Sequence, residues 1–184
     1  MDDGTAPIRG EVPIAFPQFA DEGELKLHGF ARESTWAVKE QGDEGVVMEL
    51  VGNEETRKIW PHSFRLEYTV KLSSSGTYLD LSLRVINSGS SPFTFSGCLH
   101  TYFRFDDTLK VQINGLGGAQ FIDKCDSRKV KEQEEKIVTV VAESRRSVED
   151  AGKEHKEGFV DRVYLNTRDQ VRAASCLIIF YTTI

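Results

Sequence analysis

The sequence has little cysteine, with three residues among 184, at positions 98, 125 and 176. This is an odd number, and no two of them have C-x-x-C spacing. Such a set provides neither the framework of a disulfide-stapled domain nor the thiolate ligands of a structural zinc site. We therefore expect neither disulfide bonds nor a thiolate metal site in this chain.

The chain also lacks an excess of positive charge and a long apolar run. Its 23 lysines and arginines stand against 29 aspartates and glutamates, a net charge of −6. Proteins that bind nucleic acid or anionic membranes non-specifically present a basic surface. We therefore expect this chain to bind neither. The longest apolar run, 176–181, is far too short to cross a bilayer, and the residues from Met1 to Gly4 show no secretory signal. A cytoplasmic protein of one domain is expected at this length.

What the sequence does have is the alternation typical of β-strands. Apolar side chains occupy every second position in 64–72 and again in 79–85, with turn residues at 73–76 between the two runs. This pattern predicts an antiparallel hairpin with one buried face. A further strand is predicted through Phe93 and Phe95 toward the motif that follows them.

Shorter strands are predicted at 111–113, 137–141 and 163–165, and a polar loop at 142–158. The glycines of 115–118 indicate a tight turn. They do not fit G-x-G-x-x-G and no Lys-Ser/Thr pair follows, so a nucleotide-binding loop is not expected. Many short strands at close spacing predict an all-β sandwich or barrel.

Two clusters add reactive groups to this pattern. His100 lies in the run 97–103, Gly-Cys-Leu-His-Thr-Tyr-Phe, and 28–32 reads His-Gly-Phe-Ala-Arg. Histidine transfers protons near neutral pH, and arginine holds a phosphate through two parallel hydrogen bonds. Together they favour chemistry on a phosphorylated metabolite, although a single buried histidine is more often a hydrogen-bonded structural residue. We interpret His62 as structural and assign His155 no function.

Six short motifs follow one another from about residue 8 to about residue 167. They are Ile8-Arg9-Gly10, Phe16-Pro17-Gln18-Phe19, His28-Gly29-Phe30-Ala31-Arg32-x-x-Thr35-Trp36, Trp60-Pro61-His62, Leu99-His100-Thr101-Tyr102-Phe103 and Asp161-Arg162-Val163-Tyr164. Together they resemble the hexose-6-phosphate mutarotases, the glucose-6-phosphate 1-epimerase branch of the aldose 1-epimerase-like proteins. The resemblance implies a galactose-mutarotase-like β-supersandwich.

The resemblance also implies that this domain is incomplete. Members of the family have strands before the first motif and a long segment after the last, so 1–184 is predicted to be a single mutarotase-like domain lacking both parts. The tail 168–184 resembles nothing expected there. The glutamate that serves as general base in the family lies in the later segment, so no residue here is assigned that role. A truncated isoform is one hypothesis for this pattern.

The implied reaction interconverts the α and β anomers of a hexose 6-phosphate, with glucose 6-phosphate as substrate. A base takes the proton of the anomeric hydroxyl and an acid protonates the ring oxygen, which opens the ring. By the resemblance, His100 is the general acid, Arg9 and Arg32 clamp the phosphate, Asp161 binds a sugar hydroxyl and His28 lines the pocket. The reaction needs no metal or organic cofactor.

Two positions depart from the family pattern. Glu11 stands where the family has a second glycine after the arginine, and Leu27 stands where it has a sugar-binding glutamine. A sugar hydroxyl left unpaired at Leu27 would cost about 1–3 kcal/mol. Two alternatives remain open, namely a catalytically inactive sugar-phosphate-binding relative and a mutarotase for unphosphorylated sugar. Nothing in the sequence indicates an oligomeric state.

Overall fold

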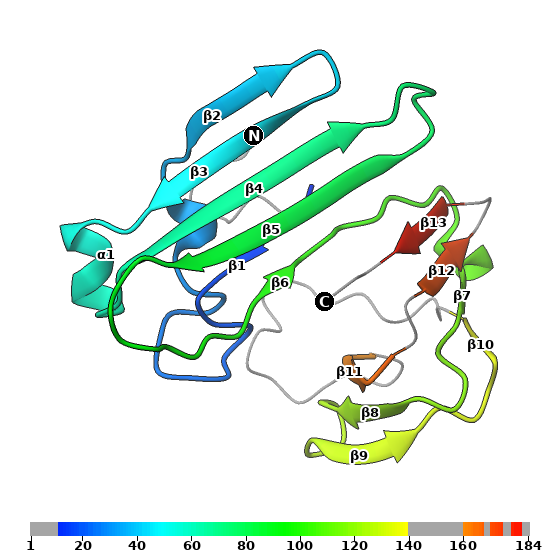
Figure 1. Cartoon of the computed structure of the whole chain (residues 1–184). Helices are drawn as coiled ribbons and strands as arrows, with labels where there is room; N and C mark the ends of the chain where they lie inside the picture. The colour runs from blue at the N-terminus through cyan, green and yellow to red at the C-terminus, as the bar shows by residue number, and fades with distance from the viewer. Residues whose placement is uncertain (1–10, 140–159, 168–169, 175–177, 182–184) are drawn as a thin grey trace, which may run out of the picture. The chain divides into compact units, whose positions relative to one another are not determined.

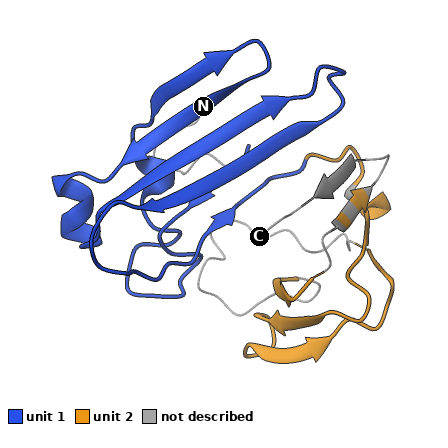
Figure 2. Ribbon diagram, in the orientation of Figure 1, with its two compact units in different colours: residues 1–103 blue, residues 104–184 orange. Residues whose placement is uncertain are grey.

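The structure is a computed structural model that describes residues 11–139, 160–167, 170–174 and 178–181. The chain forms two compact units, residues 1–103 and 104–184 (Figure 2). The described elements are strands apart from one short α-helix and two 3-10 turns, which confirms the predicted all-β class. In this part of the chain, no helix has the length and apolar character needed to span a membrane.

A four-stranded antiparallel sheet is the main layer of the first unit (Figure 1). Its strands, in spatial and chain order, are β2 (Ala37–Gly42), β3 (Gly45–Val51), β4 (Phe64–Leu72) and β5 (Leu79–Asn87). The predicted hairpin is therefore confirmed as β4 and β5. At its turn, the Gly76 N–H donates to the Ser73 carbonyl over 2.8 Å, and Gly76 has a φ of +68°.

Only part of the hairpin's apolar face is buried as predicted. Phe64 and Leu66, at one end of β4, are fully buried, whereas Leu72 and Leu79 at the turn end are more than half exposed. The buried end of the hairpin packs into a core cluster that also contains Leu50 of β3. Alternation in sequence therefore predicted which side chains share a face, and packing decided which of them lose contact with water.

The second layer contains β1 (Ile14–Ala15), β6 (Cys98–Leu99) and the 3-10 turn η1 (Ala31–Glu33). The helix α1 (Glu54–Ile59) joins β3 to β4. It begins at a capping box, in which the Asn53 side chain accepts from the Thr56 N–H and the Thr56 side chain accepts from the Asn53 N–H. This arrangement satisfies two backbone donors that the first helical turn leaves free.

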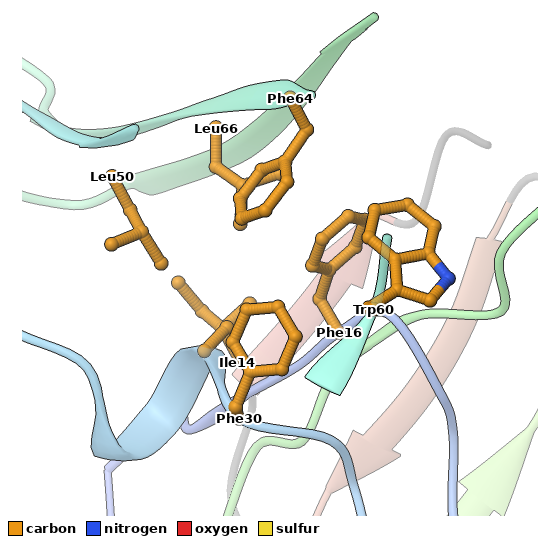
Figure 3. Packing of buried hydrophobic residues seen from close by; sticks show 8 residues of the cluster. Ile14, Phe16, Phe30, Leu50, Trp60, Phe64 and Leu66 are labelled. Carbon is orange, nitrogen blue, oxygen red and sulfur yellow. The ribbon is translucent and has the colours of Figure 1, made fainter. Parts of the chain in front are cut away.

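Phe16 lies at the centre of the core between these layers, and its side chain is fully buried (Figure 3). Its ring centroid is 5.3 Å from that of Trp60, 5.4 Å from that of Phe64 and 6.4 Å from that of Phe30. The Trp60 and Phe30 rings meet Phe16 edge to face, the geometry that favours aromatic pairs beyond simple burial. The core therefore depends on the motif Phe16-Pro17-Gln18-Phe19.

The strand predicted to lead to His100 is present only as β6 and does not include Phe93 or Phe95. Residues 88–97 form no strand, and β6 begins only at Cys98. The Phe93 ring packs on Trp60 with centroids 4.7 Å apart, and the Phe95 ring lies 5.3 Å from Phe16. The two rings thus cover the core from an irregular segment, and alternation alone does not distinguish that arrangement from a paired strand.

The outer face of the sheet carries a cluster of charges around Glu67. Its carboxylate accepts from Lys39 Nζ over 2.6 Å, and Arg65 and Arg84 lie 3.4 and 3.5 Å away. The hydrogen bond from Lys39 is the main reason that the pKa of Glu67 lies below its usual value. Arg84 lies directly opposite Glu67 on β5, and a cross-strand pair of opposite charge supports the pairing of its two strands.

The second unit contains two small antiparallel sheets. One has the order β10 (Ile137–Thr139), β7 (Gln112–Asn114), β12 (Gln170–Ala174) and β13 (Ile178–Tyr181), and the other has the order β11 (Arg162–Leu165), β8 (Gln120–Asp123) and β9 (Lys129–Glu132). A 3-10 turn, η2 (Thr108–Lys110), precedes β7. The strands predicted at 111–113, 137–141 and 163–165 are confirmed within the described residues, as is the turn at 115–118, where Gly118 has a φ of +78°.

Candidate active site

Strand β1 lies between the two predicted clusters and brings them together. On one side it pairs with β6, so that Ile14 is opposite Leu99, and the His100 N–H donates to the Pro13 carbonyl over 2.8 Å. On the other side, Phe16 just after β1 forms a parallel bridge with Gly29. The imidazole rings of His28 and His100 therefore meet, with centroids 5.0 Å apart and planes at 74°. Two histidines from distant parts of the sequence share one site.

The backbone and the ring of His28 are both held by hydrogen bonds. Its N–H donates to the Ala20 carbonyl over 3.0 Å, and its carbonyl accepts from the Phe16 N–H over 3.2 Å. Its Nδ1 accepts from the Ala20 N–H over 3.1 Å. His28 has a φ of +66°, a left-handed conformation that costs a non-glycine residue about 1–2 kcal/mol. Such an outlier at a cluster of titratable groups supports a functional role.

Gly29 is required by this turn. It has a φ of +67°, and a Cβ at this position would overlap the Phe16 carbonyl and come within 2.8 Å of Pro17 N. Both obstacles are backbone atoms beside the core and cannot rotate away. The His28-Gly29 pair of the motif is thus a pair of left-handed residues, and only glycine fits the second position.

His100 is half-buried at the end of β6. Its ring packs on that of Tyr102, with centroids 5.0 Å apart, in addition to its contact with His28. Two aromatic neighbours and one backbone hydrogen bond limit the positions that the ring can adopt. An imidazole held in this way and still reached by solvent is suited to proton transfer.

Arg32 is tied to the same loop. Its Nη2 donates to the carbonyl of Leu27, the residue before His28, over 2.9 Å. Its Nε is buried and makes no hydrogen bond within the described residues, and the nearest carboxylate oxygen, of Glu33, is 3.8 Å away. The Arg32 side chain as a whole is 25% exposed. Glu33 also pairs with Lys26 over 2.7 Å, so two cations surround one carboxylate.

The other two predicted site residues are less fully described. Arg9 lies outside the described residues. Asp161 lies in the second unit, where it is half-buried just before β11 and its carbonyl accepts from the Lys124 N–H over 2.9 Å. Within the described residues, no three His, Cys, Asp or Glu side chains gather as a metal site requires.

The remaining residues of the Asp161 motif support the second unit. Arg162 stacks over the Phe121 ring at 4.5 Å and donates to Gln133 Oε1 over 3.1 Å. The Tyr164 hydroxyl donates to the same oxygen over 2.8 Å. Gln133 is buried, so these two donors satisfy an acceptor that would otherwise be costly.

Both departures from the family pattern have a backbone role. Glu11 has a φ of +62°, a conformation in which a glycine would be unstrained. Its side chain is exposed, and its backbone carbonyl accepts from the Tyr102 N–H over 2.9 Å. The Leu27 side chain is 51% exposed, and its carbonyl holds Arg32. Neither side chain has to be glycine or glutamine for these backbone contacts to form.

The model of the Aldose 1-epimerase family matches residues 3–179 of this chain. The chain belongs to the aldose 1-epimerase family. A Cenchrus ciliaris protein provisionally named glucose-6-phosphate 1-epimerase is 33% identical over 190 residues, covering 89% of this chain and 57% of its own length. The resemblance found in the motifs is thereby confirmed.

Two solved structures are similar to the structure of this chain. A Salmonella typhimurium protein provisionally described as a mutarotase has a TM-score of 0.70 and 32% identity, covering 91% of this chain and 51% of that one. A galactose mutarotase related enzyme from Lactobacillus acidophilus has a TM-score of 0.63 and 18% identity, covering 88% of this chain and 58% of that one. The galactose-mutarotase-like fold is thus confirmed. The chain spans about half the length of the relatives it matches.

Sequence reasoning gave no role to Gln18, although the residue lies in a motif. Its side chain is 4% exposed and makes three hydrogen bonds to the loop that carries His28. The sequence contains one sign of this role, an amide side chain between Phe16-Pro17 and Phe19. A polar residue in a buried aromatic segment has to be hydrogen-bonded.

Proposed function

We propose that this protein interconverts the α and β anomers of a hexose 6-phosphate, with glucose 6-phosphate as substrate. The observation that carries the proposal is the contact of His28 with His100 beside a loop that also holds Arg32. In the proposed site, His100 is the proton-transfer group, and Arg32, which donates to the carbonyl of the residue before His28, is the phosphate-binding cation. Membership in the aldose 1-epimerase family supports the reaction type.

In the proposed reaction, His100 donates a proton to the ring oxygen as the ring opens and takes it back as the ring closes on the other face. A positioned acid or base of this kind contributes about 10²–10⁴-fold to a rate. His28 hydrogen-bonds a sugar hydroxyl. Arg32, with Arg9, holds the 6-phosphate. The partner base that takes the proton of the anomeric hydroxyl is not assigned.

A second candidate is binding of a sugar phosphate without turnover. Ring opening needs an acid and a base, and among the described residues only His100 has been given a proton-transfer role. The binding groups His28 and Arg32 do not depend on that base. Anomer exchange and ligand affinity are therefore separate measurements that distinguish the two candidates.

Two-dimensional NMR exchange spectroscopy on glucose 6-phosphate tests the proposed reaction. We expect added protein to raise the rate of α/β exchange above the rate in buffer alone, and to raise it less for glucose. Amide dispersion in the same sample reports whether the chain is folded. A folded chain that leaves the exchange rate of glucose 6-phosphate unchanged would contradict turnover and select binding alone.

Replacing Arg32 with glutamine tests the phosphate contact. A hydrogen bond between charged groups contributes about 1.5–3 kcal/mol, so R32Q is expected to weaken glucose 6-phosphate binding by about 10–100-fold. Affinity for glucose should change less than about twofold, because glucose has no phosphate for the guanidinium to hold. Calorimetric titration of both sugars measures the difference.

Arg57 provides the matched control for this change. It is an exposed arginine on α1, and R57Q removes the same charge from the same unit. We expect R57Q to bind both sugars as the unmodified chain does. Equal weakening by R32Q and R57Q would indicate a general effect of charge, and equal loss of both sugars in R32Q would place Arg32 away from the phosphate.

A further inference from the structure

The Gln18 side chain fills the inside of the loop between Phe16 and His28. Its Nε2 donates to the carbonyls of Ala20 and Leu25, each over 3.1 Å, and its Oε1 accepts from the Leu25 N–H over 2.9 Å. A Cβ on Gly23 would overlap Oε1, so the loop closes tightly around the amide. The amide of Gln18 thus satisfies the backbone carbonyl of Ala20 and both backbone polar groups of Leu25.

Ala20 connects this amide to His28. The Ala20 carbonyl accepts from Gln18 Nε2 and also from the His28 N–H over 3.0 Å. The Ala20 N–H donates to His28 Nδ1 over 3.1 Å. Ala20 is buried and has a φ of +52°, a left-handed conformation that its neighbours must hold in place. Gln18 is one of those neighbours and His28 is the other.

The bond at Nδ1 decides which nitrogen of His28 carries the proton. A nitrogen that accepts from an N–H cannot itself be protonated, so the hydrogen of the neutral imidazole is on Nε2. Nε2 is then a donor. In the proposed reaction, His28 would therefore give a hydrogen bond to a lone pair of the sugar rather than accept one from a hydroxyl.

We propose that Gln18 is a positioning residue that, through Ala20, holds His28 as the Nε2-protonated tautomer and as a donor to the sugar. The inference rests on the proposed function only in naming the sugar as the acceptor of the hydrogen bond from His28 Nε2. The tautomer and its dependence on Gln18 are properties of the protein without a ligand. Gln18 contacts no substrate in this role and acts on His28 through the backbone of the loop, at Ala20.

Nitrogen-15 NMR of the histidine rings tests the tautomer directly in the unmodified chain. We expect His28 Nδ1 to resonate as an unprotonated nitrogen and Nε2 as a protonated one, with a scalar coupling between the Ala20 amide nitrogen and Nδ1 across the hydrogen bond. A His28 ring protonated at Nδ1 would overturn the inference without any variant. This outcome does not depend on whether the protein acts on a sugar.

Gln18→Met tests the dependence on Gln18, because methionine has a similar length and none of the three hydrogen bonds. We expect the Ala20–His28 coupling to be lost and the two ring resonances to move toward each other, while affinity for glucose 6-phosphate falls by about 10-fold. In Gln18→Glu, at mildly alkaline pH, a carboxylate oxygen still accepts from the Leu25 N–H, but the side chain has no donor for the Ala20 carbonyl. The ring pattern should therefore change in Gln18→Glu as it does in Gln18→Met.

Gln133→Met is the matched control, since Gln133 is an equally buried glutamine in the other unit, where its side chain bonds Glu135, Arg162 and Tyr164. It should leave the His28 ring resonances unchanged. Unchanged resonances in a folded Gln18→Met chain would overturn the inference, as would an equal change in Gln133→Met. If the ring pattern responds as expected but glucose 6-phosphate does not bind, the proposed function fails and the positioning role stands.

Discussion

Replacing His100 with alanine is expected to lower the protein-dependent α/β exchange of glucose 6-phosphate by about 10²–10⁴-fold, the contribution of one positioned acid or base. The imidazole contacts His28 and Tyr102 and is half-buried, so its removal takes away the proton donor with little loss of packing. The backbone hydrogen bond to Pro13 does not involve the side chain and should remain. Exchange spectroscopy measures the rate.

His62 supplies the matched control for H100A. It is also half-buried, and its ring packs on the Trp60 ring with centroids 4.6 Å apart, but we propose no catalytic role for it. H62A is therefore expected to retain its exchange rate per folded molecule. Affinity for glucose 6-phosphate should fall by less than tenfold in H100A, because the phosphate contact is elsewhere. An H100A chain that exchanges the anomers at the unmodified rate would remove His100 from the reaction.

Replacing Phe16 with alanine is expected to lower the free energy of unfolding of the first unit by about 3–5 kcal/mol, the usual cost of deleting a buried aromatic ring. Its side chain is fully buried and contacts four aromatic rings, those of Phe30, Trp60, Phe64 and Phe95. Phe64 lies in β4, and Phe30 and Trp60 adjoin η1 and α1, so these three rings have little freedom to move into the space that is left. Since a domain is stable by about 5–15 kcal/mol, F16A removes a large share of that stability.

Urea unfolding, monitored by tryptophan fluorescence, measures the free energy of unfolding of the first unit. Both tryptophans of the chain, Trp36 and Trp60, lie in residues 1–103, so their fluorescence reports on the first unit alone. Phe103→Ala is the control, because that side chain is 43% exposed and its loss should cost about 1–2 kcal/mol. A cost for F16A no greater than for F103A would contradict the central position of Phe16 in the core.

The strand pattern of this protein was readable in its sequence because β-structure has a period of two residues. The runs 64–72 and 79–85 repeat that period for long enough to predict β4, β5 and the turn at 73–76. The same rule failed at Phe93 and Phe95, where two aromatic rings alternate without a strand. An irregular segment can present alternate residues to a core, and only the hydrogen bonds of a partner strand make it a strand.

The sequence by itself determined the all-β class and the family, since short motifs and a simple period carry that information, and it predicted His28 and His100 as reactive groups. Only the tertiary structure decided how those groups meet. The pairing of β1 with β6 and its bridge to Gly29 bring His28 to 5.0 Å from His100, and no local pattern encodes a contact over that separation. The tautomer of His28 and the role of Gln18 likewise depend on hydrogen bonds to the Ala20 backbone, which form only when the loop is closed.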